Sequence, residues 1–314
     1  MNLPDPKHPS SAYWAAGLTL LLWSSSYAAI RFGLQVFTPG EVAFLRFAIA
    51  ALFFAVPVAL GLIKLPPRSE WPGVIVLVLI GNTVYHLCLG YAMTRISAGA
   101  AAVVISTVPS VSAVLAVLRL KEHISARAVT GLAVAFAGTL LVTLGRGHSV
   151  QFEPMALLVL VSVLCSSIFF VFQKPVLARV DALGFNAAMT FVTALSFLPF
   201  SFELPHKLAA VPPAEIGAML YLGLLPTVVG YLSWSWALAR APASRVTSFL
   251  YLQPVLACVI AFFWLGEIPT WLTVMGGVLA IVGVVLATAR GLKLPSRRRS
   301  QAVPAAPVAP ETCN

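Results

Sequence analysis

The stretch from Tyr91 to Thr143 reads YAMTRISAGAAAVVISTVPSVSAVLAVLRLKEHISARAVTGLAVAFAGTLLVT. A second stretch, from Trp236 to Thr288, matches it without a gap at a shift of 145 positions and reads WALARAPASRVTSFLYLQPVLACVIAFFWLGEIPTWLTVMGGVLAIVGVVLAT. The chain therefore contains two copies of one unit, and we expect its function to lie where the copies meet. Matches at Arg, Pro, Glu and Gly weigh most, because apolar runs align by chance. These matches pair Arg95 with Arg240, Pro109 with Pro254, Glu122 with Glu267, Gly131 with Gly276, and Gly138 with Gly283.

The composition of the chain favours an integral membrane protein. Hydrophobic residues make up 60% of the 314 residues, charged residues make up 10%, and the mean hydropathy is +0.94. A soluble domain carries about 25% charged residues. The net charge of +10 does not indicate a nucleic-acid partner, because the basic residues lie in short loops and in the tail. The expected partners are a small-molecule substrate and the lipid bilayer, with no nucleic acid.

Charged residues divide the chain into apolar segments. A spanning helix needs about 20 residues for a hydrocarbon core about 30 Å thick. The second segment reaches that length, as about 42–63, if Arg46 lies inside the helix. We predict an all-α integral membrane fold with ten transmembrane helices, arranged as two inverted five-helix repeats around a central cavity. The segments without Asp, Glu, Lys or Arg are 8–30, 47–63, 71–94, 96–118, 128–145, 154–173, 182–202, 216–239, 246–266 and 268–289.

The basic residues predict the orientation. With a cytoplasmic N-terminus, 15 Lys and Arg residues fall inside and four fall outside, and Arg46 lies within the membrane. We therefore expect a multi-pass protein of the bacterial inner (plasma) membrane with both termini cytoplasmic. The first apolar segment has no convincing cleavage site for a signal peptide. The expected divisions are a cytoplasmic segment 1–11, a first repeat 12–145, a second repeat 154–289, and a disordered basic tail 290–314.

At this point the chain resembles a known family. The run AFLRFAIAAL around Arg46, and the doubled pattern that begins with Pro109, Glu122 and Gly131, are similar to the EamA-domain branch of the drug/metabolite transporter superfamily. The resemblance covers about residues 12–289. It implies ten helices in two inverted repeats, a central substrate cavity, and export of amino acids or other small metabolites. The pattern is specific for the superfamily but says little about the substrate.

The third and eighth predicted helices carry polar and aromatic stripes. Asn82, Tyr85 and His86 stand at i, i+3 and i+4 and therefore share one face of the third helix. Hydrocarbon does not favour such a face, so it points either into a water-filled cavity or toward a neighbouring helix that it hydrogen-bonds. The repetition of the stripe in both copies favours the cavity. The residues of the eighth helix are Thr227, Tyr231 and Trp234.

Other helices add candidate substrate-binding residues. An aromatic ring with a polar tip can stack on a ligand and also hydrogen-bond to it, so Tyr27 and Tyr251 are candidates. Ser248 continues the polar face of the ninth helix, and Gln173 follows Ser166 and Phe170 on the sixth. Small residues on these faces also allow helices to pack closely, which is the alternative role of the serines.

Four residues mark points where helices can bend. Pro109 and Pro254 fall inside the fourth and ninth predicted helices, where each removes a backbone donor and is expected to kink the helix. Gly81 in the third helix falls on Pro226 in the eighth. These positions either flex during alternating access or form static kinks that shape packing.

Few ionisable groups lie at membrane depth. We expect a structural role for Arg46, near the outer end of the second helix, although it could also bind a substrate carboxylate. Glu122 and Glu267 precede the fifth and tenth helices, where a carboxylate complements the helix dipole. His86 is the one group well inside a helix that titrates near neutral pH. It either carries a proton or orients the substrate as a neutral ring, with Asn82 as a hydrogen-bond partner.

The sequence contains no Walker motif, no HExxH zinc site and no GxSxG elbow. We therefore expect no cofactor, no metal and no enzymatic activity. The prediction is a secondary transporter of small organic solutes, an exporter or facilitator working by alternating access, with amino acids or related amphipathic metabolites as first candidates. The alternatives are an intramembrane enzyme using His86 with Ser106 or Ser248, and a membrane sensor that transports nothing. Substrate identity, direction of transport, coupling ion and oligomeric state stay open.

Overall fold

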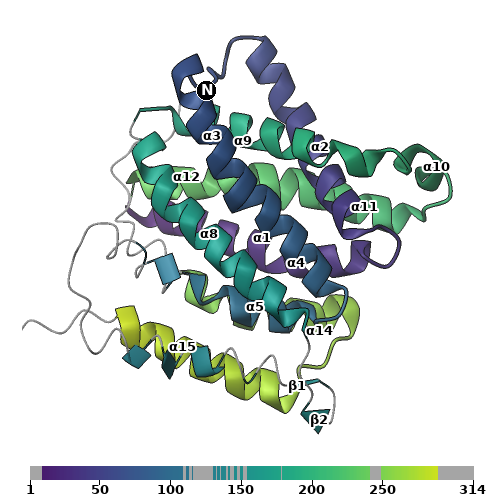
Figure 1. Cartoon of the computed structure of the whole chain (residues 1–314), viewed down its shortest axis with the longest axis vertical. Helices are drawn as coiled ribbons and strands as arrows, with labels where there is room; N and C mark the ends of the chain where they lie inside the picture. Colours follow the sequence, from purple (N-terminus) through teal and green to yellow (C-terminus); the bar gives the residue numbers. More distant parts are fainter. Residues whose placement is uncertain are drawn as a thin grey trace, which may run out of the picture.

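The protein is an assembly of helices in a computed structural model (Figure 1). Two two-residue strands, β1 (Gly145–Arg146) and β2 (Ser149–Val150), form a small antiparallel hairpin between the two halves of the chain. The structure describes residues 9–108, 111–112, 115, 130–131, 133–134, 136–138, 141, 145–146, 149–150, 154–177, 179–240 and 249–288.

In residues 9–108, the continuously described part of the first half, three long helical runs are followed by a shorter one. The third run is continuous from Arg68 to Met93, and its middle is a π-helical segment. The elements are α1 (Pro9–Gly33), α2 (Pro39–Ala59), η1 (Arg68–Glu70), α3 (Trp71–Val78), the π-helical η2 (Leu79–Val84), α4 (Tyr85–Met93) and α5 (Ala98–Ile105).

The second half repeats this pattern. Its third helical run also contains a π-helical segment, η4, between α11 and α12. The elements are α8 (Ala156–Leu177), α9 (Ala182–Ser196), η3 (Leu198–Ser201), α10 (Leu204–Leu208), α11 (Pro213–Leu222), the π-helical η4 (Gly223–Val229), α12 (Gly230–Arg240), η5 (Phe249–Leu252), α14 (Gln253–Leu265) and α15 (Trp271–Thr288).

Helix α2 starts earlier than the apolar pattern predicted. Thr38 and Glu41 form a capping box: the Glu41 backbone N–H donates to the Thr38 hydroxyl, and the Thr38 N–H donates to the Glu41 carboxylate. This cap satisfies backbone donors that would otherwise lack partners, and Pro39 fits the first turn because its missing N–H is not needed there. Arg46 therefore lies two turns inside α2 and not at its end.

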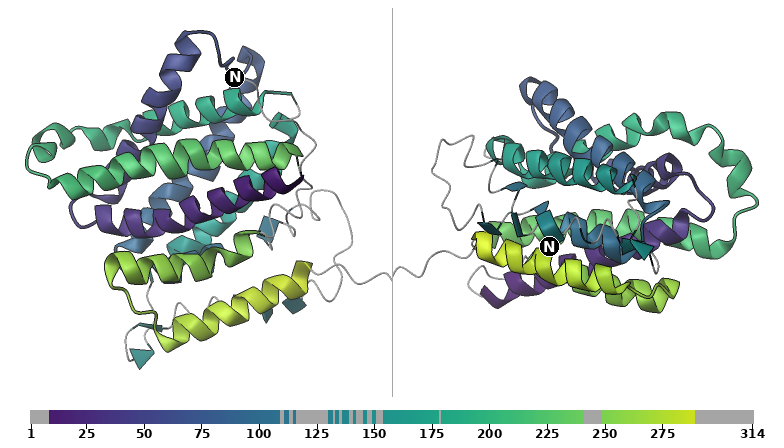
Figure 2. Two further views of the ribbon diagram at one scale, coloured as in Figure 1. Left: turned by 180° about the vertical axis from the view of Figure 1, so that it is seen from behind. Right: turned by 60° about the horizontal axis from the view of Figure 1, so that its bottom comes forward.

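Four helical runs are long and apolar enough to cross a membrane: Pro39–Ala59, Arg68–Met93, Ala156–Leu177 and Pro213–Trp234. Helix α1 is also long, at 25 residues, but it carries the serine run from Ser24 to Ser26 and is packed on several sides. Figure 2 shows α1 between α12 on one side and α14 on the other. The N-terminal helix of the first half thus lies among helices of the second half.

The described part of the fifth predicted helix packs against α15 through small residues. A Cβ atom on Gly138 would lie 2.4 Å from the Ala280 nitrogen and 2.6 Å from the Gly276 oxygen. Only glycine permits this close approach of two backbones. Two of the repeated glycines, Gly138 of the first half and Gly276 of the second, therefore lie in direct contact.

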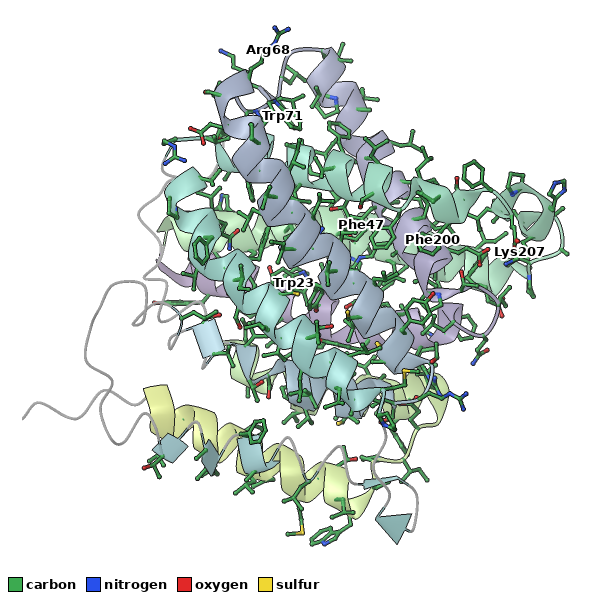
Figure 3. The ribbon with its side chains drawn as sticks, in the orientation of Figure 1. Trp23, Phe47, Arg68, Trp71, Phe200 and Lys207 are labelled. Atoms are coloured by element: carbon green, nitrogen blue, oxygen red, sulfur yellow. The ribbon has the colours of Figure 1, made fainter. Side chains whose placement is uncertain are left out.

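Ion pairs hold the ends of the helices. At the end where α2 begins, the Lys207 ammonium lies 2.6 Å from the Glu41 carboxylate, and this hydrogen bond raises the pKa of Lys207. At the other end, Arg179 makes two hydrogen bonds to Glu70, of 2.8 and 2.9 Å. Figure 3 shows Lys207 at the projecting end of the molecule, whereas Trp23 and Phe47 lie in its interior.

Candidate functional site

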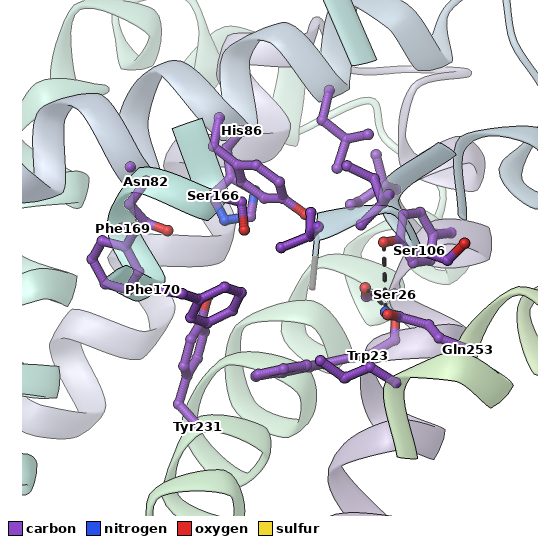
Figure 4. A pocket seen from close by; sticks show the side chains of 18 of the residues that line it. Trp23, Ser26, Asn82, His86, Ser106, Ser166, Phe169, Phe170, Tyr231 and Gln253 are labelled. Atoms are coloured by element: carbon purple, nitrogen blue, oxygen red, sulfur yellow. Dashed lines mark hydrogen bonds between the residues drawn. The ribbon is translucent and has the colours of Figure 1, made fainter. Parts of the chain in front are cut away.

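A cavity of about 80 Å³ lies in the interior, between helices of both halves of the chain. By volume it can hold several water molecules or a small solute. Its wall combines a cation, an imidazole, amides, hydroxyls and aromatic rings with aliphatic side chains (Figure 4). The lining residues are Trp23, Ser26, Tyr27, Ile30, Arg46, Gly81, Asn82, Tyr85, His86, Leu89, Ile105, Ser106, Val108, Ser166, Phe169, Phe170, Tyr231, Leu250 and Gln253.

Arg46 of α2 is buried in the wall of this cavity, with 4% of its surface exposed. Its Nε donates to the Thr227 hydroxyl at 2.7 Å, and its guanidinium carbon lies 5.6 Å from the centre of the Phe47 ring. The bond to Thr227 agrees with an anchoring role. The sequence favoured a structural role for Arg46. Its position in the cavity wall also allows it to contact a ligand.

Pro226 of η4 explains how the Thr227 hydroxyl comes to bind Arg46. Pro226 has no backbone N–H, so it cannot donate to the Leu222 carbonyl as an α-helical residue would. The Thr227 hydroxyl donates to that carbonyl instead, at 2.8 Å. Its oxygen then accepts the hydrogen bond from Arg46. A helix irregularity in the second half thus positions a cation of the first half.

The same segment positions Trp23 of α1. The Trp23 indole nitrogen donates to the Pro226 carbonyl at 3.1 Å. Its ring centre lies 5.3 Å from that of Tyr231 and 5.2 Å from that of Trp234. A Cβ atom on Gly230 would lie 2.8 Å from the indole nitrogen, so the glycine leaves room for this ring. Trp23 lines the cavity, and Trp234 packs behind it.

His86 of α4 lies between two aromatic rings. Its ring centre is 4.9 Å from that of Phe47 and 4.7 Å from that of Tyr85, both in edge-on contacts. The His86 Nε2 atom is buried and has no hydrogen-bond partner within the described part of the chain. The expected bond from Asn82 to the imidazole is not the one formed, because α9 packs against η2 and the Asn82 amide donates to Thr193 at 2.7 Å.

The opposite wall of the cavity comes from α1 and α14. The Gln253 amide donates to the Tyr27 hydroxyl at 3.5 Å, and the Ser24 hydroxyl donates to the Gln253 carbonyl at 3.4 Å. Figure 4 shows Gln253 and Trp23 on one side of the space and Asn82 and His86 on the other. Sequence reasoning missed Gln253, although a lone amide inside the apolar segment 246–266 was a usable signal.

The predicted site residues divide into three groups. Asn82, Tyr85 and His86 line the cavity, as do Tyr27, Tyr231 and Gly81. Thr227 and Trp234 lie behind the lining, in contact with Arg46 and Trp23 respectively, and Gln173 is half-buried on α8 outside the lining. Pro109, Glu122, Ser248 and the side chain of Tyr251 lie outside the described residues.

The structure shows the local geometry at three of the four predicted bending points, and it differs from the expected one at Pro254. Pro254 lies in the first turn of α14, after the 3-10 segment η5, so the expected kink inside a helix is a junction between two helix types. At that position the missing N–H of proline costs nothing. Gly81 and Pro226 lie in the π-helical segments η2 and η4, which occupy equivalent positions in the two copies.

Glu267 precedes α15, but its carboxylate does not cap that helix. It accepts a hydrogen bond of 3.0 Å from the Ala98 N–H at the start of α5, and it lies 3.5 Å from Arg31 of α1. Arg31 also donates to the Met93 carbonyl at the end of α4. The carboxylate therefore stabilises the N-terminus of α5 and not that of α15. The sequence does not show which helix end lies nearby in space.

Comparisons with known proteins agree with this architecture. The model of the EamA-like transporter family matches residues 10–144 and again 153–289. A protein of Streptantibioticus cattleyicolor named "Probable terminal-alkyne amino-acid exporter" is 32% identical, covering 94% of this chain and 98% of its own. An uncharacterized transporter of Bacillus subtilis is 33% identical over 85% of this chain and 87% of its own.

A solved structure supports the fold. It is titled only "Crystal structure of protein" and superposes with a TM-score of 0.60, covering 89% of this chain and 97% of its own. At 23% sequence identity, the similarity to this structure concerns the fold alone.

Proposed function

Because the chain belongs to the EamA-like transporter family, we propose that it is a secondary transporter that moves amino acids or related small amphipathic metabolites across the membrane. It is a multi-pass membrane transporter and not an enzyme. The proposal adds a substrate class and a mechanism to this family assignment.

The observation that carries the proposal is the mixed lining of the central cavity. One part of its wall is polar and includes Arg46, Asn82, His86 and Gln253. Another part is aliphatic and includes Ile30, Leu89, Ile105 and Val108. Binding sites for small molecules combine an apolar wall with a few polar groups that orient the ligand. An amino acid, with a charged head and an apolar side chain, has the matching chemistry.

We further propose that the two halves are inverted repeats that rock against each other around this cavity. The sequence repeat, the equivalent positions of η2 and η4, and the mixed origin of the lining support this mechanism. Broken or irregular helices at a repeat interface are typical of secondary transporters. The orientation that we propose has both termini on the cytoplasmic side of a bacterial inner membrane, with the basic loops facing inward.

A terminal-alkyne amino acid is a suitable first probe, because a relative with 32% identity carries that substrate in its name. Propargylglycine has a three-carbon apolar side chain that suits the aliphatic part of the wall. Direction and coupling are separate questions, and a facilitator or an exporter would both bind it.

The test is counterflow of labelled amino acids, propargylglycine included, into proteoliposomes that contain the purified protein and an excess of unlabelled solute. We expect transient accumulation of the unmodified solute, and its loss or weakening in Tyr231→Leu, which removes a hydroxyl from the cavity wall. Tyr91→Leu is the matched control, because Tyr91 is an exposed tyrosine of α4 that does not line the cavity.

Different outcomes separate the alternatives. Chemical conversion of the solute would indicate an intramembrane enzyme. Neither flux nor conversion for any member of the panel would contradict the proposed substrate class and would favour a sensor.

A further inference from the structure

Arg46 is a buried cation with which no carboxylate of the described residues forms an ion pair. The described ion pairs are those of Arg31, Arg179 and Lys207, and all of them lie at helix ends. Among residues 9–108, 154–177, 179–240 and 249–288, no carboxylate pairs with Arg46. Removing a charge from water is costly unless an opposite charge compensates it. A cation kept at this depth indicates a role in a ligand or ion pathway.

The guanidinium is held so that it can bind a ligand in a fixed geometry. Arginine has five N–H donors in a rigid, planar arrangement. The Nε donor is used for Thr227, which fixes the plane of the group, and the guanidinium also lies over the Phe47 ring. Arg46 lines the central cavity and also a smaller cavity of about 10 Å³ that extends toward Pro39 and Gly90. Arg46 therefore lies, with Ile30, His86 and Leu89, in the wall that the two cavities share.

His86 supplies a second, independent indication of a ligand. Its side chain lines the same two cavities as Arg46, and its buried Nε2 has no protein partner in the described ranges. Unpaired buried polar atoms are rare in folded proteins and call for an explanation. Within the described ranges, the Arg46 cation lacks an anion and the His86 ring nitrogen lacks a partner, and both side chains line the same cavities. A single polar ligand group can satisfy both.

We propose that Arg46 is the carboxylate-binding, specificity-determining residue of the cavity, with Thr227 as its positioning residue and His86 as the second contact to the head of the substrate. This inference rests on the proposed function and narrows its substrate class to carboxylates. A carboxylate accepts two parallel hydrogen bonds from arginine and neutralises its charge. Amides and amines of the same shape leave the guanidinium unpaired and are rejected.

The first experiment measures binding to the purified full-length protein, so that it does not depend on transport. The ligands are L-norvaline, L-norvalinamide and butylamine, which share one apolar chain and differ in the carboxylate. Isothermal titration and the shift of the thermal unfolding midpoint serve as the readouts. We expect norvaline to bind about 10- to 100-fold more tightly than either analogue, because the analogues lose the charged hydrogen bonds between carboxylate and guanidinium.

The second experiment uses variants. Arg46→Gln is expected to lose the preference for norvaline over norvalinamide, and Arg46→Lys to keep part of it, because lysine retains the charge but not the two-pronged geometry. Thr227→Val is expected to weaken norvaline binding while leaving the order of the three ligands intact. Arg179→Gln is the matched control, because it removes an exposed arginine at a helix end far from the lining.

Several outcomes would overturn the inference. One is equal binding of the acid, the amide and the amine by the unmodified protein. Another is the absence of binding by all three. Retention of the full carboxylate preference in a folded Arg46→Gln protein would be the third. If Arg46→Gln does not fold, the ligand series on the unmodified protein decides alone.

The binding result and the transport result can fail separately. A protein that exchanges amino acids and amides equally well retains the proposed function and contradicts the carboxylate inference. A protein that binds carboxylates selectively but shows no flux supports the carboxylate inference and contradicts the proposed transport function.

Discussion

At the residue scale, the role of His86 depends on what surrounds it. Its ring contacts Phe47 and Tyr85, and it shares the cavity wall with the cation Arg46. No Asp or Glu is among the described residues that line the cavity. A proton pathway through a membrane protein usually contains a series of titratable groups, and no described carboxylate shares the cavity wall with His86. The surroundings favour a ring that orients the substrate.

We therefore predict that His86→Gln retains downhill flux with an apparent KM altered severalfold. A pH gradient is expected to drive little accumulation of a zwitterionic substrate by either protein. Uptake into proteoliposomes, with and without an imposed gradient, measures both quantities. Strong pH-driven accumulation that disappears in His86→Gln, while exchange persists, would instead identify His86 as the proton carrier.

Glu267 lies in the loop before α15 and gives a pH-dependent prediction. Burial raises the pKa of its carboxyl, and the Ala98 N–H and Arg31 oppose this effect without cancelling it. A carboxyl whose folded pKa exceeds its unfolded pKa holds its proton longer in the folded state. Stability from this group is therefore fully present below the unfolded pKa, of about 4.3 for glutamate, and is lost as pH rises through the folded pKa.

The expected result is that the unfolding midpoint of the unmodified protein falls relative to Glu267→Gln as pH rises from about 4 toward neutrality. The amide keeps a hydrogen-bond acceptor for Ala98 but does not titrate. Thermal unfolding of the detergent-solubilised proteins over this range makes the comparison, with Glu203→Gln as the exposed-acid control. If the midpoint of the unmodified protein instead rises relative to that of Glu267→Gln, the effects of Arg31 and Ala98 on the carboxyl pKa outweigh the effect of burial.

At the scale of elements, η2 and η4 connect backbone irregularity to the cavity. Gly81 of η2 lines the cavity, and a Cβ atom there would lie 2.4 Å from the Phe169 Cβ. In η4, Pro226 frees the Leu222 carbonyl for Thr227 and offers its own carbonyl to Trp23. π-helical turns often occur at functional sites. Here η4 positions Arg46 and Trp23 in the wall, and η2 contributes Gly81 and Asn82 to it.

Pro226→Ala restores the backbone donor of residue 226 and allows η4 to revert toward α-helical geometry. The Thr227 hydroxyl then competes for the Leu222 carbonyl, and Trp23 loses a favourably placed acceptor. We predict unchanged or higher thermal stability, because an interior proline is removed, together with a severalfold higher apparent KM. Uptake kinetics and the unfolding midpoint of the same preparation test both parts. A lower midpoint with an unchanged KM would show that the proline serves stability and not the site.

At the scale of the whole molecule, some features follow from sequence and others require the packing of helices. Apolar length and the repeat at a shift of 145 predict helices, and the stripe of Asn82, Tyr85 and His86 predicts a face that lines the cavity. The partner of Asn82 and the helix stabilised by Glu267 could not be predicted, because both are set by neighbours distant in sequence. The bond that holds Arg46 in the cavity wall could not be predicted for the same reason, since Thr227 lies 181 positions away.

The orientation of the two halves is the remaining whole-molecule prediction. Fifteen basic residues on one side and four on the other place both termini in the cytoplasm if five helices precede the β1–β2 hairpin. Alkaline phosphatase, which is active only outside the cytoplasm, is therefore expected to be inactive when fused after Asn314 and active when fused after Val150. The second fusion is the internal control, because an odd number of spans must reverse the side. Equal activity of the two fusions would contradict the inverted arrangement, since it would leave an even number of spans between the hairpin and the C-terminus. Opposite activities would leave an odd number in the second half, so that two similar sequence units enter the membrane from opposite sides and meet at one central cavity.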